Sequence, residues 1–217
     1  MEAEREQVAS ASRRLAAERL VLGTAGNVSA RNGDLVAISP TGAVLAELEP
    51  DQVSVVALET GKLIDGPFEP TSELDLHLGV YRRYKAGAVV HTHAPWATAI
   101  ACALDELPCV HYQLMLLGGT VRVAPYRTFG TPELAEVVLD ALVGRTAVLM
   151  ANHGALNYAA DPAAAVEGAL LLEWACEVYW RAAALRPKPH VLSKKERQAV
   201  VDAVVERGYG AKRRADG

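Results

Sequence analysis

Two hairpin signals in the first third of the chain constrain the fold more than any other feature. The strands expected at 27–31 and 34–39 are separated by Asn32 and Gly33, which both tolerate a positive φ and therefore suit a tight turn. A second pair of expected strands, 52–58 and 62–66, flanks Thr60 and Gly61 in the same way. Because a hairpin joins antiparallel neighbours, at least part of the sheet is expected to be antiparallel.

Helical patterns alternate with further strands along the rest of the chain. We expect strands at 88–93, near 120–125 and at 147–152, and helices over 3–21, from Ser72 or Glu73 to about Lys85, from Pro95, and over 132–143, 162–184 and 194–207. Ser72 is expected to cap the second of these helices. A chain of 217 residues, 51% of them hydrophobic, can bury one sizeable core. We therefore predict a single α/β or α+β domain over residues 1–217.

The charge balance and the cysteine content exclude several classes of protein. The formal net charge is −4, and the only basic cluster is Lys212, Arg213 and Arg214, in a tail expected to be mobile from about residue 208. Nucleic acid is therefore not an expected partner. Three cysteines form no CxxC pair and no even disulfide framework, which suits a reducing compartment. Every apolar run is broken by charges well before the about 18 residues that a membrane span needs. We expect a cytoplasmic protein without a membrane partner.

Two histidines interrupt the apolar strand expected at 88–93. His91 and His93 are one residue apart, so their side chains leave the same face of an extended strand while Thr92 points away. Two imidazoles about 7 Å apart at their Cα atoms can share a metal ion, although the pair also suits hydrogen bonding at a sheet edge. His153, after the expected strand 147–152, offers a third ligand. Three histidines fit a tetrahedral Zn²⁺ site with one open position, which is the catalytic arrangement.

The remaining histidines give a weaker signal. His77 lies within an expected helix, His111 follows an irregular proline-containing segment, and His190 follows two prolines near the C-terminus. We interpret all three as structural or surface residues.

Polar residues at element boundaries provide the other parts of an active site. Glu73 opens the helix that precedes the histidine strand, and suits either a general base beside a metal or a carboxylate favoured by the helix dipole. Backbone N–H groups and short hydroxyl donors at turns can bind a phosphate. Such positions are Gly26, Asn27, Ser39, Thr41, Gly42, Thr71 and Ser72. Neither the dinucleotide nor the P-loop glycine motif is present, so a nucleotide is not indicated.

Five sequence blocks together resemble the class II aldolase/adducin family. They are GTAGNVSAR, ISPTG, PTSELDLHLGVYRR, AVVHTHAPWATA and ANHGAL, in the order and spacing of that family, and the resemblance covers roughly residues 5–185. The chain is most similar to the members that cleave L-fuculose 1-phosphate. The resemblance implies a three-layer α/β/α fold around a central, largely antiparallel sheet, assembled as a C4 homotetramer with sites between neighbouring subunits.

The resemblance also implies a role for each candidate residue. His91, His93 and His153 match the three ligands of Zn²⁺ or another divalent metal, and Glu73 matches the catalytic acid/base, which also touches the metal when no substrate is bound. Tyr112 matches a proton donor supplied by a neighbouring subunit, and Tyr209 matches a second, mobile tyrosine. The phosphate-binding positions match Asn27, Thr41, Gly42, Thr71 and Ser72, with Gly26 beside them.

The implied reaction is reversible cleavage of a ketose 1-phosphate, either L-fuculose 1-phosphate or a close analogue, to dihydroxyacetone phosphate and an aldehyde such as L-lactaldehyde. The metal would act as a Lewis acid that stabilises the enediolate left when the C–C bond breaks, so no lysine Schiff base is required.

Three related functions remain as alternatives. L-Ribulose-5-phosphate 4-epimerases usually carry aspartate where this chain has Glu73, so the longer side chain favours the aldolases. Methylthioribulose-1-phosphate dehydratases share the three histidines and the enediolate chemistry. Adducin-type interaction domains lack the metal ligands, and the intact histidine set disfavours that function.

Overall fold

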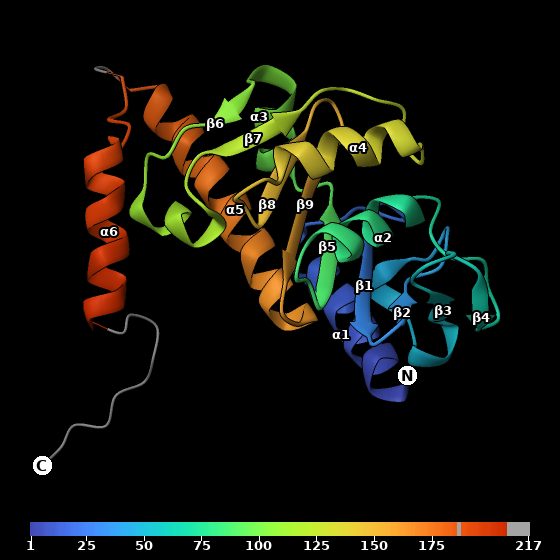
Figure 1. Ribbon diagram of the computed structural model, residues 1–217. Helices are drawn as coiled ribbons and strands as arrows, with labels where there is room; N and C mark the ends of the chain where they lie inside the picture. The colour runs from blue at the N-terminus through green and yellow to red at the C-terminus, as the bar shows by residue number, and fades with distance from the viewer. Residues whose placement is uncertain (186–187, 208–217) are drawn as a thin grey trace, which may run out of the picture.

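A single sheet forms the centre of the molecule. The computed structural model describes residues 1–185 and 188–207, and these residues form a nine-stranded sheet in the order β4-β3-β2-β1-β5-β9-β8-β7-β6 (Figure 1). Neighbouring strands are antiparallel except β7 and β8, which are parallel, so the prediction of a largely antiparallel α/β fold is confirmed. The strands are β1 (Asn27–Asn32), β2 (Leu35–Ile38), β3 (Ser54–Ala57), β4 (Leu63–Asp65), β5 (Ala88–Thr92), β6 (Glu106–Leu107), β7 (Val121–Ala124), β8 (Ala147–Met150) and β9 (Gly154–Ala159).

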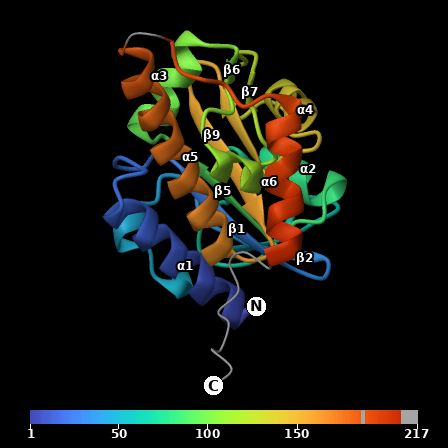
Figure 2. The ribbon, with the colours of Figure 1, turned by 90° about the vertical axis from the view of Figure 1, so that its left-hand side faces the viewer.

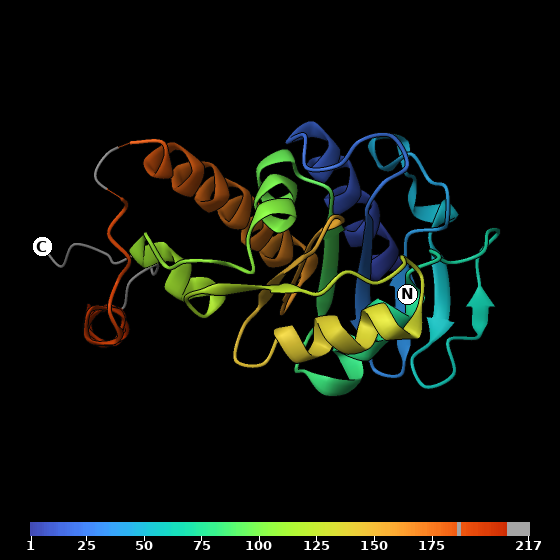
Figure 3. The same ribbon diagram turned by 90° about the horizontal axis from the view of Figure 1, so that it is seen from above.

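Helices cover both faces of the sheet and complete the three predicted layers. On one face lie α1 (Glu2–Ala17), α3 (Pro95–Ala103) and α5 (Pro162–Ala183), and Figure 2 shows α1 and α5 crossing in front of the strands. On the other face lie α2 (Leu74–Arg83) and α4 (Pro132–Ala141), as the view from above shows (Figure 3). At one side, α6 (Lys194–Arg207) packs beside the 3₁₀ helix η3 (Tyr112–Leu117). Two further 3₁₀ helices are η1 (Leu45–Glu47) and η2 (Pro50–Gln52).

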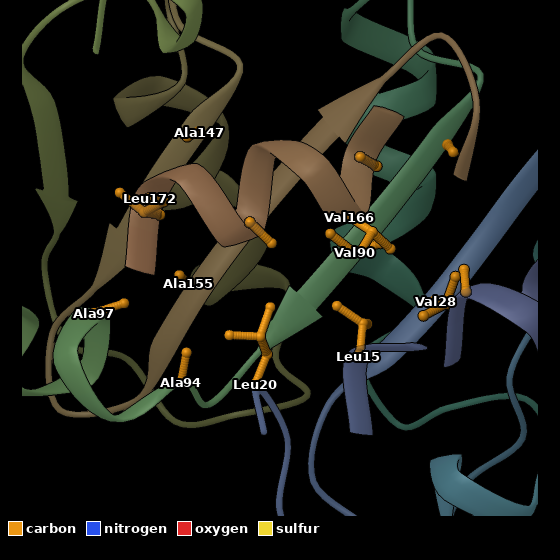
Figure 4. Packing of buried hydrophobic residues seen from close by; sticks show 14 of the residues in the cluster. Leu15, Leu20, Val28, Val90, Ala94, Ala97, Ala147, Ala155, Val166 and Leu172 are labelled. Carbon is orange, nitrogen blue, oxygen red and sulfur yellow. The ribbon is translucent and has the colours of Figure 1, made fainter. Parts of the chain in front are cut away.

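Alternating strand residues divide between two hydrophobic cores. Val28 and Val90 are buried beneath α1 and α5, in the cluster that Figure 4 shows. Val89 faces the opposite way and packs with the buried residues of α2 and α4. Since residues two apart in a strand share a face, His91 follows Val89 toward the α2 layer. Strand geometry therefore places this histidine beneath the helix that Glu73 precedes.

Several local predictions were wrong. The N-cap of α2 is Glu73 rather than Ser72, and the Glu73 side chain makes no capping hydrogen bond because its carboxylate is turned toward the histidines. The strands β6 and β9 were not expected: β6 has only two residues, and the GALNYA sequence of β9 lacks a clear alternation of apolar and polar residues. Tyr209, the basic cluster at 212–214 and the tail predicted from 208 lie outside the described residues.

The structure also bears on the cysteine and membrane expectations. All three cysteines are free, with Cys109 and Cys176 buried and Cys102 exposed. Among the helices of residues 1–185 and 188–207, none is long and apolar enough to cross a bilayer.

Candidate active site

Three histidines meet where β5 ends and where β8 turns into β9. His91 belongs to β5, His93 follows that strand, and His153 precedes β9. Because β5 pairs with β9, the segment that carries His153 is brought beside the other two residues. The three pairs of ring centroids are 4.7, 4.8 and 5.0 Å apart, and the possible ligand atoms all lie within 4.8 Å of one another. This three-histidine group can hold one metal ion.

Hydrogen bonding directs a nitrogen of His91 into this group. Nδ1 of His91 lies 2.9 Å from the carbonyl oxygen of Ala155, so Nδ1–H donates to that oxygen and Nε2 is the nitrogen available for a metal. Nε2 of His91 and Nε2 of His93 are 2.9 Å apart. Two imidazole nitrogens that face each other at this distance need a proton or a cation between them, and a divalent cation fits this requirement.

The Glu73 carboxylate faces the same group. Its Oε2 atom lies 3.1 Å from Nε2 of His91, and its Oε1 atom lies 3.5 Å from Nε2 of His153. Burial raises the pKa of Glu73, but the charge of His91 and hydrogen bonds from His91 and Asn27 outweigh burial and hold this pKa well below its usual range. Oε1 is buried and accepts no hydrogen bond from the described residues. An ionised carboxylate with an unsatisfied oxygen is a second feature that fits a cation at this place.

The protonation of the histidines also suits metal binding. Burial, reinforced by the charge of His91, lowers the pKa of His93 and of His153 to about 4. Both rings are therefore neutral at pH 7, which is the form that binds a metal. Burial opposes a charge on His91 too, but the adjacent Glu73 carboxylate raises the pKa of His91 above its usual value. In the absence of a metal, His91 and Glu73 share a proton, and a bound metal would take the place of that proton.

A cavity of about 500 Å³ opens beside Glu73, His93 and His153. The buried His91 lies behind it and does not line it. Gly26 has a φ of 85°, and a Cβ atom at this position would lie 2.8 Å from the carbonyl oxygen of His91, so this wall of the cavity requires glycine. Six of the seven positions predicted to suit a phosphate line the cavity: Gly26, Asn27, Thr41, Gly42, Thr71 and Ser72. The seventh, Ser39, is buried outside the cavity, where its hydroxyl oxygen accepts from Val28 N–H.

The cavity also contains residues that the sequence patterns did not indicate. Tyr126, Arg127 and Phe129 lie in the segment between β7 and α4 and line the outer part, where Tyr126 and Phe129 are 58% and 66% exposed. Two aromatic residues and an arginine close together in a connecting segment form the sequence pattern that could have indicated this part of the cavity. Asn152 also lines the cavity, and its φ of 54° is unusual for a residue other than glycine.

One predicted catalytic residue lies away from this cavity. Tyr112 is in η3, is 42% exposed, and its ring centroid lies 4.7 Å from that of His111. It does not line the cavity of its own chain.

A larger cavity, of about 570 Å³, lies along α5 and contains Asn157 and Trp174 in its lining. The three-histidine group is not part of that cavity, so we assign the chemistry to the smaller one.

The geometry agrees with what is found when this chain is compared with known proteins. Residues 6–180 match the family described as "Class II Aldolase and Adducin N-terminal domain".

The chain belongs to the class II aldolase family.

Relatives of this class II aldolase align along most of its length. A 5-deoxy-D-ribulose 1-phosphate aldolase of Bacillus thuringiensis serovar kurstaki is 37% identical over 213 residues, covering 97% of this chain and 98% of the relative. A 5-methylthioribulose-1-phosphate/5-deoxyribulose-1-phosphate aldolase of Rhodospirillum rubrum is 36% identical, covering 91% and 89%. The solved structure of an L-fuculose 1-phosphate aldolase has a TM-score of 0.88 at 32% identity, covering 94% and 96%. This chain is accordingly an enzyme, a lyase of the class II aldolase type.

Proposed function

We propose that this enzyme cleaves a ketose 1-phosphate reversibly to dihydroxyacetone phosphate and a short aldehyde, with a divalent metal, expected to be zinc, held by His91, His93 and His153. One observation carries the proposal: a single cavity combines two of these ligands, the Glu73 carboxylate and a wall of hydroxyl, amide and glycine groups. Such a metal supplies a Lewis acid that stabilises negative charge developing on the ketone oxygen.

Different residues of the chain would then transfer the proton and orient the substrate. Glu73 gives a proton to the carbon that loses the aldehyde during cleavage, and removes it in the direction of synthesis. Thr41, Gly42, Thr71 and Ser72 hold the phosphate, which does not react but fixes the position of the reacting carbon. The N-terminus of α2 follows Ser72 and Glu73 directly, and its dipole favours an anion at this end of the cavity.

The aldehyde half of the substrate would lie toward Tyr126 and Phe129. These exposed aromatic rings suit an apolar terminal group, such as the methyl group of a deoxy sugar, better than a row of hydroxyl groups. The relative from Bacillus thuringiensis, which aligns with almost the whole chain, is named for 5-deoxy-D-ribulose 1-phosphate. We therefore place 5-deoxyribulose 1-phosphate first among substrates, with acetaldehyde as its product, and L-fuculose 1-phosphate second.

The active site would be completed by another copy of the chain. Tyr112 is partly exposed and lies outside the cavity of its own subunit, which supports its proposed role as a proton donor to a neighbouring site in a homotetramer. The three free cysteines suit a reducing compartment, and we propose that the enzyme acts in the cytoplasm.

A panel of ketose phosphates tests this function. The zinc-loaded enzyme is incubated with the 1-phosphates of 5-deoxyribulose, fuculose, rhamnulose and ribulose, and the released aldehyde and dihydroxyacetone phosphate are measured. We expect cleavage of 5-deoxyribulose 1-phosphate with the highest kcat/KM. An epimer or a dehydrated ketone, instead of aldehyde, would contradict the aldolase assignment and support the epimerase or dehydratase alternative.

A further inference from the structure

A row of buried polar side chains extends from Glu73 into the protein, away from the cavity. Glu73, His77 and Tyr81 are four residues apart, so they share one face of α2 and its first turn. That face lies against β1, where Asn27 and Ser29 point into the same layer since they are two residues apart. The four residues behind Glu73 are at most 4% exposed. None of the three residues deepest in this row, Ser29, His77 and Tyr81, has a part in the chemistry proposed above.

The hydrogen bonds in this row run in one direction. The Asn27 amide nitrogen lies 3.0 Å from Oε2 of Glu73 and 3.1 Å from Oγ1 of Thr71, so Nδ2 donates one hydrogen to each oxygen. The other end of the amide, Oδ1, must then accept, and it lies 2.5 Å from Nε2 of His77. His77 therefore carries its proton on Nε2.

The far side of His77 is arranged to keep that tautomer. Nδ1 of His77 lies 2.7 Å from the Ser29 hydroxyl oxygen, and with Nε2 protonated this Nδ1 is the acceptor. Ser29 donates to His77 and accepts from the Tyr81 hydroxyl at 2.7 Å. Burial, with the charge of His91, lowers the pKa of His77 to about 3, so the ring holds a single proton at pH 7.

We propose that His77 is a positioning residue, which fixes the Asn27 amide with its NH₂ group toward Glu73 and Thr71 and thereby holds the Glu73 carboxylate in place for proton transfer. Without this donor, Oδ1 of Asn27 would be buried and unpaired, and only the two hydrogen bonds from Nδ2 would oppose a 180° turn of the amide, which would direct Oδ1 at the carboxylate and repel it. The inference rests on the proposed role of Glu73. The residue that sets the orientation of the Asn27 amide, His77, touches neither substrate nor metal.

Two substitutions at one position separate positioning from structural support. In His77→Leu the donor to Asn27 is lost, and we expect kcat to fall about 10- to 100-fold, more than KM rises, because a misplaced catalytic group costs rate. In His77→Gln the side-chain amide can still donate to Oδ1 of Asn27, and we expect most of kcat to return. Tyr81→Phe, at the far end of the row, is the control that alters the same buried layer without touching Asn27. We expect stoichiometric zinc in all three variants.

Nitrogen NMR of the metal-free protein supplies a readout that does not need turnover. With ¹⁵N-labelled histidine, His77 should show a protonated Nε2 and an unprotonated Nδ1. The Asn27 side-chain amide should exchange slowly with solvent in the wild type and in His77→Gln, and quickly in His77→Leu. Protonation at Nδ1, or equal kcat per folded, zinc-loaded molecule in wild type and His77→Leu, would overturn the inference. If the wild type cleaves no ketose phosphate, the proposed function fails instead, and the NMR result still decides the orientation of the amide.

Discussion

At the scale of single residues, the ligands and the proposed base are expected to respond differently to substitution. Glu73→Gln keeps the shape of the side chain and leaves the three histidines intact, so zinc should be retained. Exchange of the hydroxymethyl protons of dihydroxyacetone phosphate with solvent should fall at least about 100-fold, because the general base is lost. Zinc content is measured by atomic absorption and proton exchange by ¹H NMR in D₂O.

His93→Ala is the matched contrast to Glu73→Gln. It removes one of three nitrogen ligands while Glu73 remains, so zinc content itself should fall. Full zinc in His93→Ala would contradict the metal assignment, and nearly normal proton exchange in Glu73→Gln would remove Glu73 from the role of base.

The buried neutral histidines should also make the stability of the metal-free protein depend on pH. The pKa of His77 is about 3 in the folded chain, below the unfolded value of about 6.5, so between these values the unfolded chain binds a proton that the folded chain excludes. The free energy of unfolding therefore falls as pH falls, by about 1.4 kcal/mol per pH unit for this residue. The free energy of unfolding can be measured with urea at several pH values between about 5.5 and 4.5. Its change per pH unit should be smaller in His77→Gln than in the wild type by that amount. An unchanged slope would mean that His77 is already protonated in the fold.

At the scale of secondary-structure elements, a carboxylate from α5 caps α3. Glu173 Oε1 accepts from Trp96 N–H at 2.9 Å, and Oε2 accepts from Ala97 N–H at 2.8 Å. These are the first N–H groups of α3, which lack partners within the helix, and α3 begins two residues after His93. The bond between these two helices therefore also holds the segment that carries a proposed metal ligand.

Removing this cap should destabilise the protein measurably. We expect Glu173→Ala to lower the free energy of unfolding by about 1–3 kcal/mol, since two charge-assisted hydrogen bonds are lost. Glu177→Ala, one turn further along α5, removes a surface pair with Arg181 and should cost under about 0.5 kcal/mol. Chemical denaturation of both variants measures the difference, and equal losses would show that the cap contributes no more than a surface pair.

At the scale of the whole molecule, the proposed donor Tyr112 can be tested by complementation between subunits. Glu73→Gln and Tyr112→Phe are each expected to be nearly inactive. If Tyr112 serves the site of a neighbour, mixed tetramers from co-expression of the two variants contain sites with an intact Glu73 from one chain and an intact Tyr112 from the next.

The expected recovery follows from random assembly. At equal expression, a site combines the two intact residues in about a quarter of cases, so about a quarter of wild-type activity should return. Native mass spectrometry would establish the oligomer and its mixing. No recovery in verified mixed oligomers would place Tyr112 outside the neighbouring site.

The features that depend on spacing within one element could be predicted from the sequence. A period of two places His91 and His93 on one side of an extended segment, and the hairpin between β1 and β2 was expected from its turn residues. Its turn is one residue later than predicted, at Gly33 and Asp34, because Asn32 still pairs with Leu35. The glycine, amide and hydroxyl positions next to strand and helix ends were likewise recognised from local patterns, and six of these seven line the cavity. Ser39 is the exception. The same five blocks of residues identified the family that the comparison confirms.

How these local features meet depends on contacts between elements that are distant along the chain. The distance from Glu73 to His91 depends on how α2 packs on the sheet, the approach of His153 depends on the β5–β9 pairing, and Asn27 lies opposite His91 through the β1–β5 register. The local pattern around His77 predicts only a structural or surface residue for the same reason, since its contact with Asn27 crosses from a helix to a strand 50 residues away. Local spacing fixes side chains within an element, whereas contacts between elements follow from strand register and helix packing, which no local pattern specifies.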